Sequence, residues 1–334
     1  MNKETKDPPR GRIERNASGE PSGTLREGAM ELVERIVPPV TDKVRLAGLE
    51  KAQALANSFG ITSIQDADAN PDVLNAYLEL QRQSKLTLKV VAALHTDPAQ
   101  GPDQVQRLLR MREKFTCGRL RCSAAKIFAD GVIEAHTASL MEPYSDRPGY
   151  SGIANYSAEA LDQLVSALSL ARFQVHIHAI GDRAVHDALD AFKNVSADSH
   201  ALRPEIAHLE LVAPEDIKRF RQYGVIANCQ AFWAFNDPYI QKCTVPLIGA
   251  ERCKRLYPFQ SIYQTGATIA GGSDWPVTTL NPLDAIQVAV TRQPLDNPAE
   301  APLLANERMA LPDMIAAYTI NGAYVNHEEN ETGS

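Results

Sequence analysis

Short apolar stretches alternate with amphipathic ones along most of the chain. Seven stretches are rich in small and branched apolar residues and short enough to be buried strands: 60–65, 86–94, 123–128, 173–178, 206–211, 225–229 and 268–271. Segments with apolar residues at helical spacing lie between several of them, most clearly at 71–84, 157–171, 182–195 and 214–223. The first of these follows Asn70 and opens on Pro71, and the last ends against Gly224, which are common helix boundaries.

This order of elements predicts an α/β fold. A strand, a helix and a further strand give parallel strands joined by right-handed crossovers. About seven such strands are typical of a nearly complete (β/α) barrel or of an open doubly wound sheet. No glycine-rich phosphate fingerprint follows any strand, which weighs against a dinucleotide-binding sheet.

Two stretches fall outside the alternation. Residues 1–40 are polar and rich in Pro and Gly, and residues 130–156 form a long connection containing Gly, Pro and Tyr. In an α/β barrel, long connections gather over the carboxyl ends of the strands, where active sites lie. We therefore expect one barrel domain over 1–334, with 1–45 as a polar N-terminal connection and 46–334 as the barrel.

Composition narrows the class of protein. The 334 residues are 44% hydrophobic and 22% charged, as in an ordinary globular chain with ample core. The net charge of −7 gives no electrostatic footprint for nucleic acid, and no stretch approaches the roughly 20 apolar residues of a membrane span. Five scattered cysteines without a Cys-x-x-Cys pair, and a polar start without a signal-like apolar region, favour reduced thiols and a cytoplasmic location.

Four ionisable residues interrupt or directly follow the apolar stretches: Lys126, His178, His208 and Asp274. A buried charge is costly unless a partner or a metal compensates it. Their separations of 52, 30 and 66 residues fit the strand ends of one barrel, so we expect the four side chains to converge. Two imidazoles, a carboxylate and a lysine suit a divalent metal and a hydrolytic water.

Each of these residues alone also has a structural interpretation. A single strand-end histidine is commonly a hydrogen-bonded core or surface residue. Lys126 could bury its stem while its amine reaches water, and Asp274 could form a turn before Pro276. Of His176 and His178, we expect only one to face the barrel centre, and we favour His178 because it lies nearer the strand end.

Other candidates carry weaker signals. His136 lies in the long connection, where it would contact substrate. Trp233, in the aromatic stretch 232–235, would line an apolar pocket, although a packing role is equally compatible. His95 and Asp66 also lie near strand ends, where we expect solvated or loop-anchoring roles.

Several segments together resemble a known family. They are Lys126–Gly131 (KIFADG), His178–Val185 (HAIGDRAV), Ala207–Glu210 (AHLE) and Gly272–Val277 (GSDWPV), with further similarity at 7–27 and 317–323. Each is weak alone, but the joint set is specific and resembles the YtcJ-like branch of the metal-dependent amidohydrolase superfamily. The similarity runs over nearly the whole chain.

The resemblance implies a (β/α)8 TIM-type barrel that hydrolyses amide or related C–N bonds with one or two divalent metals. Zinc is the expected ion, with manganese or iron as alternatives. Lys126 matches the lysine of the fourth strand, which is carboxylated and bridges the metals in binuclear members. His178 and His208 match metal ligands of the fifth and sixth strands. Asp274 matches the aspartate of the eighth strand, which contacts the metal and shuttles the proton. Trp275, beside Asp274, joins His136 and Trp233 as a candidate for substrate binding.

The chain also departs from this family. Full members begin with a sandwich segment and a first barrel strand ending in His-x-His, whereas the only His-x-His here is His176-Ile177-His178. We therefore expect an incomplete barrel that lacks the first strand, two metal ligands and the sandwich. It would be either a truncated product or a remodelled barrel whose polar N-terminal segment fills the gap. Exposed strand edges would make a homo-oligomer plausible.

The sequence thus leads to three functional hypotheses. The first is a metal-dependent amidohydrolase acting on a small amide or formamide-like molecule, impaired by the missing segment. The second is a deaminase or another hydrolase on the same barrel. The third is an inactive remnant that serves as a subunit or binding module.

Overall fold

A curled sheet of parallel strands forms the centre of the molecule. The computed structural model describes residues 1–195 and 201–333. Within them, each of the seven predicted strands is present: β3 Ser63–Ala69, β4 Lys89–His95, β5 Leu120–Phe128, β6 Gln174–Ala179, β7 Glu205–His208, β8 Ile226–Cys229 and β9 Ile269–Gly271. Each strand pairs in parallel with the next one along the chain, in the order β3 to β9. The fold is therefore α/β, with the strand order of a barrel.

The two faces of the sheet have different environments. Alternate residues of a strand point to opposite faces. In β4, Val90, Ala92 and Leu94 belong to the main apolar core, which also includes residues of the surrounding helices. Val91 and Ala93 pack instead with Ala124 of β5 in a separate small cluster. This second face is the interior of the curled sheet.

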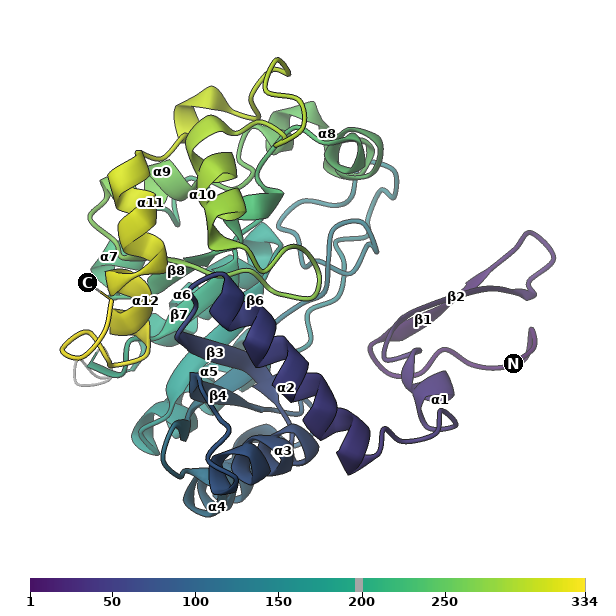
Figure 1. Ribbon diagram of the computed structural model, residues 1–334. Coiled ribbons are helices and arrows are strands. Elements are labelled where there is room, and N and C mark those ends of the chain that lie inside the picture. The colour runs from purple at the N-terminus through teal and green to yellow at the C-terminus, as the bar shows by residue number, and fades with distance from the viewer. Residues whose placement is uncertain (196–200, 334) are drawn as a thin grey trace.

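Helices connect the strands and cover the outer face (Figure 1). Their bounds are α1 Glu31–Glu34, α2 Asp42–Ser58, α3 Pro71–Arg82, α4 Val105–Phe115, α5 Ala158–Leu170, α6 Asp182–Lys193, α7 Arg219–Gln222, α8 Val245–Cys253, α9 Phe259–Gln264, α10 Pro282–Thr291, α11 Leu311–Tyr318 and α12 Ile320–Val325. Short non-α turns lie at η1 Gly101–Gln104, η3 Ala231–Trp233, η4 Ile240–Thr244 and η5 Ala305–Glu307. The predicted cap is confirmed at α3, where the Asn70 side chain accepts the amides of Asp72 and Val73.

One predicted helix is largely wrong. Of the segment 214–223, only α7 is helical, and residues 214–218 form turns. The amides of Asp216 and Arg219 donate to carbonyls three residues earlier, at Ala213 and Asp216. Bonds over three residues make tight turns rather than an α-helix.

The N-terminal segment forms a separate small unit. β1 Gly11–Arg15 and β2 Pro21–Glu27 pair antiparallel in a two-stranded sheet of their own. Figure 1 shows this hairpin and α1 beside the main body. One of our two expectations was that the N-terminal segment fills the gap left by the missing strand. The hairpin does not do so, because it does not pair with β3 or β9. Among the described residues, the edge strands β3 and β9 do not pair with each other, so the sheet stays open.

The last helix closes the interior at the amino ends of the strands. Val325 at the end of α12 packs with Ile226 of β8 and Ala270 of β9. Just beyond α12, the Glu328 carboxylate accepts hydrogen bonds from Ser63 of β3 at 3.0 Å and Arg121 of β5 at 2.8 Å. The carboxyl ends of the strands, at the opposite end, remain as the place for chemistry.

The cysteines Cys117, Cys122, Cys229, Cys243 and Cys253 are all free. Over the described residues, no helix has both the length and the apolar character to cross a membrane.

Candidate active site at the carboxyl ends of the strands

The structure brings the four predicted residues to the same end of the sheet. Lys126 lies near the end of β5, His178 in β6 and His208 at the end of β7, and all three are buried. Asp274 lies in the loop that follows β9. The two imidazoles are in direct contact, with ring centroids 4.4 Å apart in an edge-to-face arrangement.

These imidazoles belong to a row of rings along the strand ends. Phe128 of β5 lies 5.4 Å from His178, and Trp233 of η3 stacks on His208 at 5.4 Å with an interplanar angle of 2°. The indole Nε1 of Trp233 donates to Thr278 at 3.3 Å, which joins the stack to the loop carrying Asp274. The predicted aromatic wall therefore packs directly against a predicted ligand.

His208 reaches this row because its backbone leaves the strand conformation. It is the register partner of Ala179, whereas Ala207 is the partner of His178. Strict alternation would therefore point His208 away from His178. The φ angle of 79° at His208 and of 54° at Leu209 breaks the alternation and turns the imidazole inward. Such left-handed conformations are unfavourable for residues other than glycine and cluster at functional sites.

The expectation that only one of His176 and His178 faces the interior was wrong. Residues i and i+2 of a strand lie on the same face, and both imidazoles are buried on the inner side of β6. His176 Nδ1 lies 2.6 Å from Gln65 Oε1 and 3.3 Å from Glu205 Oε1. His176 therefore belongs to a polar layer beneath the site, and not to its mouth.

Glu205 is a buried charge beside the site that the sequence analysis missed. It is fully buried at the start of β7, and Asn228 donates to it at 2.8 Å. Burial alone would raise the pKa of Glu205, but His176 and Asn228 hold it below its usual value. A glutamate in a short apolar strand was the signal available in the sequence.

Lys126 lies between the polar layer of His176 and Glu205 and the strand ends that carry His178 and His208. Burial lowers the pKa of Lys126 to about 8, and the carboxylates of Asp274 and Glu205 oppose that effect. Its Nζ lies over the ring of Phe128, 5.0 Å from the centroid. The amine thus faces carboxylates both toward the mouth and toward the interior.

The two predicted histidine ligands are held in the neutral form. Burial, reinforced by the charge of Lys126, lowers the pKa of His178 to about 3. Burial and the neighbouring His178 likewise lower the pKa of His208 well below its ordinary value. A neutral imidazole is the form that binds a metal ion.

Asp130 is a second residue that the sequence analysis did not select. Its buried carboxylate accepts the backbone amides of Ser139, Ile180 and Gly181. It also lies 3.5 Å from Nε2 of His178, which is 3.1 Å from the carbonyl oxygen of Gly131. Burial raises the pKa of Asp130 to about 7, against those three amides. Asp130 and Gly131 thus fix the orientation of His178 and leave its Nδ1 for a ligand.

The remaining predicted residues occupy less central places. Asp274 has a φ of 51°, and burial of its carboxyl group raises its pKa while Lys126 opposes the shift. Trp275 is exposed at the mouth. His136 is buried in the long connection, where Nε2 contacts Asp146 at 2.8 Å and the ring packs on Tyr144. Substrate contacts by Trp275, Trp233 and His136 remain predictions.

The side chains at this site offer some, but not all, of the ligands that a divalent metal needs. Nδ1 of His208 is buried without a hydrogen-bond partner among the described residues, as a coordinating atom would be before it binds a metal. The adjacent neutral His178 offers a second nitrogen. However, across residues 1–195 and 201–333, no three His, Cys, Asp or Glu side chains converge closely enough to hold an ion. The two imidazoles are thus a partial ligand set.

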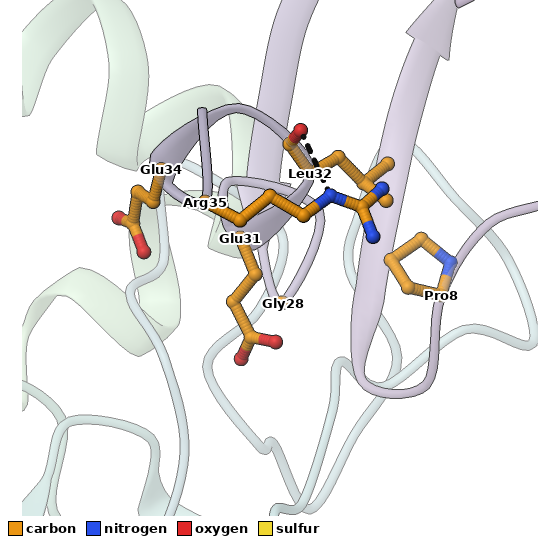
Figure 2. Close-up of a pocket in the computed structure, with 6 residues that line it drawn as sticks. All are labelled: Pro8, Gly28, Glu31, Leu32, Glu34 and Arg35. Carbon is orange, nitrogen blue, oxygen red and sulfur yellow. Dashed lines mark hydrogen bonds between the residues drawn. The ribbon is translucent and has the colours of Figure 1, made fainter. Parts of the chain in front are cut away.

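A surface hollow elsewhere is unrelated to these residues. It has a volume of about 450 Å³ and lies in the N-terminal segment, lined by Pro8, Gly28, Glu31, Leu32, Glu34 and Arg35. Figure 2 shows the Arg35 side chain extending toward Pro8, with the Glu31 and Glu34 carboxylates pointing elsewhere. None of the predicted site residues lines it, so it does not change the assignment of the candidate site.

Sequence comparison decides the family. A family profile described as the amidohydrolase family matches residues 1–334. The chain belongs to the amidohydrolase family. Curated relatives of the chain include "Protein LONG AFTER FAR-RED 3" of Arabidopsis thaliana, which is 30% identical over 99% of the chain and 58% of the relative. The "Putative amidohydrolase YtcJ" of Bacillus subtilis (strain 168) is 26% identical over 100% of the chain and 62% of the relative. The predicted YtcJ-like resemblance is thereby confirmed.

Solved structures agree with this placement. An uncharacterized metal-dependent hydrolase from Pyrococcus furiosus matches with a TM-score of 0.75 and 27% identity, over 93% of the present chain and 62% of the Pyrococcus chain. A second, from Pyrococcus horikoshii OT3, matches with a TM-score of 0.76 and 25% identity, covering 96% and 64%. These neighbours and the family imply a divalent metal. The chain spans about three fifths of the length of these relatives.

Proposed function

We propose that this amidohydrolase hydrolyses a C–N bond of a small amide or formamide-like molecule with the help of a divalent metal, zinc by preference. The observation that carries the proposal is the contact between two buried, neutral imidazoles, His178 and His208, beside Lys126 at the carboxyl ends of parallel strands. A relative that is 25% identical over 99% of the chain is named "N-substituted formamide deformylase", from Arthrobacter pascens. That name supports a formamide-like substrate.

Each residue has a defined role in this proposal. A divalent ion, when bound, supplies a water of lowered pKa and polarises a carbonyl group. His178 would hold the ion through Nδ1, because Asp130 and Gly131 occupy its Nε2. His208 would hold it through its Nδ1, which has no hydrogen-bond partner within the described part of the chain. The Asp274 carboxylate would accept the proton of the attacking water and return it to the departing nitrogen. Lys126, when carboxylated, would bridge to a second ion.

A second candidate function is favoured by one observation. In the described residues no set of three metal-ligating side chains is assembled. A chain with only part of its ligands would bind metal weakly and serve as a subunit or binding module. A deaminase on the same barrel is a further alternative, which differs only in its substrate.

The deciding experiment combines metal analysis with a substrate panel. The purified protein is loaded with Zn²⁺ or Mn²⁺, dialysed, and assayed on N-benzylformamide, N-butylformamide, N-acetylbenzylamine and a ring amine. We expect near-stoichiometric metal and release of amine plus carboxylate. Ammonia release from the ring amine alone would favour a deaminase instead.

The variants His178→Ala and Asp274→Asn test the assigned roles. We expect His178→Ala to lose metal and activity, and Asp274→Asn to lose at least about 100-fold in kcat with the metal retained, as for loss of a general acid–base. His186→Ala is the control, because His186 on α6 contacts Asp216 and lies apart from the site. Negligible metal in the wild type, with no hydrolysis in any variant, would support the binding module and refute the enzyme.

A further inference from the structure

A second histidine–carboxylate pair lies at the same end of the sheet. His95 ends β4, and its Nδ1 lies 2.7 Å from Oδ1 of Asp68 in β3. Both side chains are about half exposed, at 45% and 48%. They are accessible to a small molecule, and neither has a place in the roles assigned above.

The strand register places His95 on the inner face of the sheet. His95 is the register partner of Lys126, so the two side chains share a face. Two and four residues earlier in β4, Ala93 and Val91 pack against Ala124 in the interior cluster. The ring of His95 lies 6.2 Å from that of Phe128, which continues the row of rings toward β4.

The pair is held from both sides. The Asp68 amide donates to Asp66 at 3.4 Å, and Tyr77 donates to the other oxygen of Asp66 at 3.0 Å. Arg107 of α4 donates to the backbone carbonyl of His95 at 3.2 Å. When the Nδ1 of an imidazole donates to a fixed carboxylate, the neutral ring keeps its single proton on Nδ1, and the protonated ring also carries one on Nε2 that can be donated to a ligand.

We infer that His95, oriented by Asp68, donates a hydrogen bond from Nε2 to the carbonyl oxygen of the substrate, so that it stabilises the negative charge that develops there. The inference rests on the proposed function, because only a carbonyl substrate at this mouth would develop that charge. No proton leaves His95 in this role. Asp68 is a positioning residue, and it acts through His95.

The charges around His95 fix the expected pH dependence. The hydrogen bond that His95 donates to Asp68 raises the pKa of His95 above its usual value, and burial lowers it. The charge of Asp97 also raises this pKa, whereas that of Arg107 lowers it. Lys126, its register partner on β5, is a further cation on this face. Nε2 donates only when the imidazole is protonated. Activity should therefore fall as the pH rises through the pKa of His95.

The test uses the metal-loaded full chain and the best substrate of the panel. For His95→Gln we expect kcat to fall about 100-fold with KM changed less than about threefold, as for loss of one oxyanion donor. For Asp68→Asn we expect a smaller loss, and the alkaline limb of the kcat/KM profile should move to lower pH. Metal content and melting temperature should equal those of the wild type, since His95 is not a ligand.

The matched control is His186→Gln, which removes a histidine that is also paired with a carboxylate, Asp216, but lies on helix α6 and not on a strand of the sheet. It should leave kcat and the pH profile unchanged. An active wild type with His95→Gln within twofold of its kcat would overturn the role of His95 alone. A wild type that binds metal but hydrolyses none of the carbonyl substrates would overturn both this inference and the proposed function.

Discussion

At Gly131 the backbone has no room for a side chain. A Cβ there would overlap Thr137 Oγ1 and Glu27 Oε1, which are hydrogen-bonded to each other at 2.7 Å. We expect Gly131→Ala to cost about 1–3 kcal/mol of unfolding free energy, because the neighbours must shift. Gly48→Ala, in α2 with open space around it, should instead stabilise by up to about 1 kcal/mol. Chemical denaturation measures both, and equal effects would refute the steric explanation.

Single residues also show where sequence patterns stop being informative. The alternation of strand side chains places His178 and Lys126 in the interior of the sheet. It also places His176 there, because residues i and i+2 of a strand share a face. The same rule points His208 outward, and only the left-handed φ of 79° reverses it. A local backbone conformation of this kind depends on the surrounding packing, which the pattern does not contain.

At the level of elements, α12 and the residues after it hold β3 and β5 together at the amino end of the sheet. Glu328, 7% exposed, bonds Ser63 and Arg121, whereas Glu331 bonds Lys89 with 72% of its side chain exposed. We expect Glu328→Ala to cost about 2 kcal/mol, because it removes the buried acceptor of two hydrogen bonds from the partly buried side chains of Ser63 and Arg121, one of them from a charged donor. Glu331→Ala should have no measurable effect, since exposed ion pairs are screened by solvent. Urea unfolding checks the contrast, and similar losses in both variants would contradict it.

Element boundaries illustrate which local signals are sufficient. The Asn70–Pro71 start of α3 is complete within a few residues, and it was predicted correctly. The helix predicted over 157–171 likewise begins where Ser157 caps α5. The segment 214–223 has helical spacing, but most of it forms turns, and Asp216 bonds His186 and Arg219 there. Long-range side-chain contacts of this kind override local helical spacing.

For the whole molecule, metal binding should raise the free energy of unfolding. A ligand that binds only the folded state stabilises it by about 2.7 kcal/mol at one hundred times its Kd. We expect Zn²⁺ to raise the melting temperature of the wild type by several degrees over an EDTA-treated sample. The double variant His178→Gln, His208→Gln should lose that increase, while His186→Gln should keep it. An equal increase in the double variant would show that zinc binds elsewhere.

The sequence by itself determined the order of the strands, most of the helices and the family, because alternating apolar stretches, caps and short motifs are local signals. It also indicated which residues interrupt buried strands. The tertiary structure decided how those residues meet: His178 against His208, Glu205 beneath Lys126, Asp130 behind His178 and Asp68 beside His95. These contacts join residues far apart in the chain, and they depend on strand register and backbone turns that no single segment specifies.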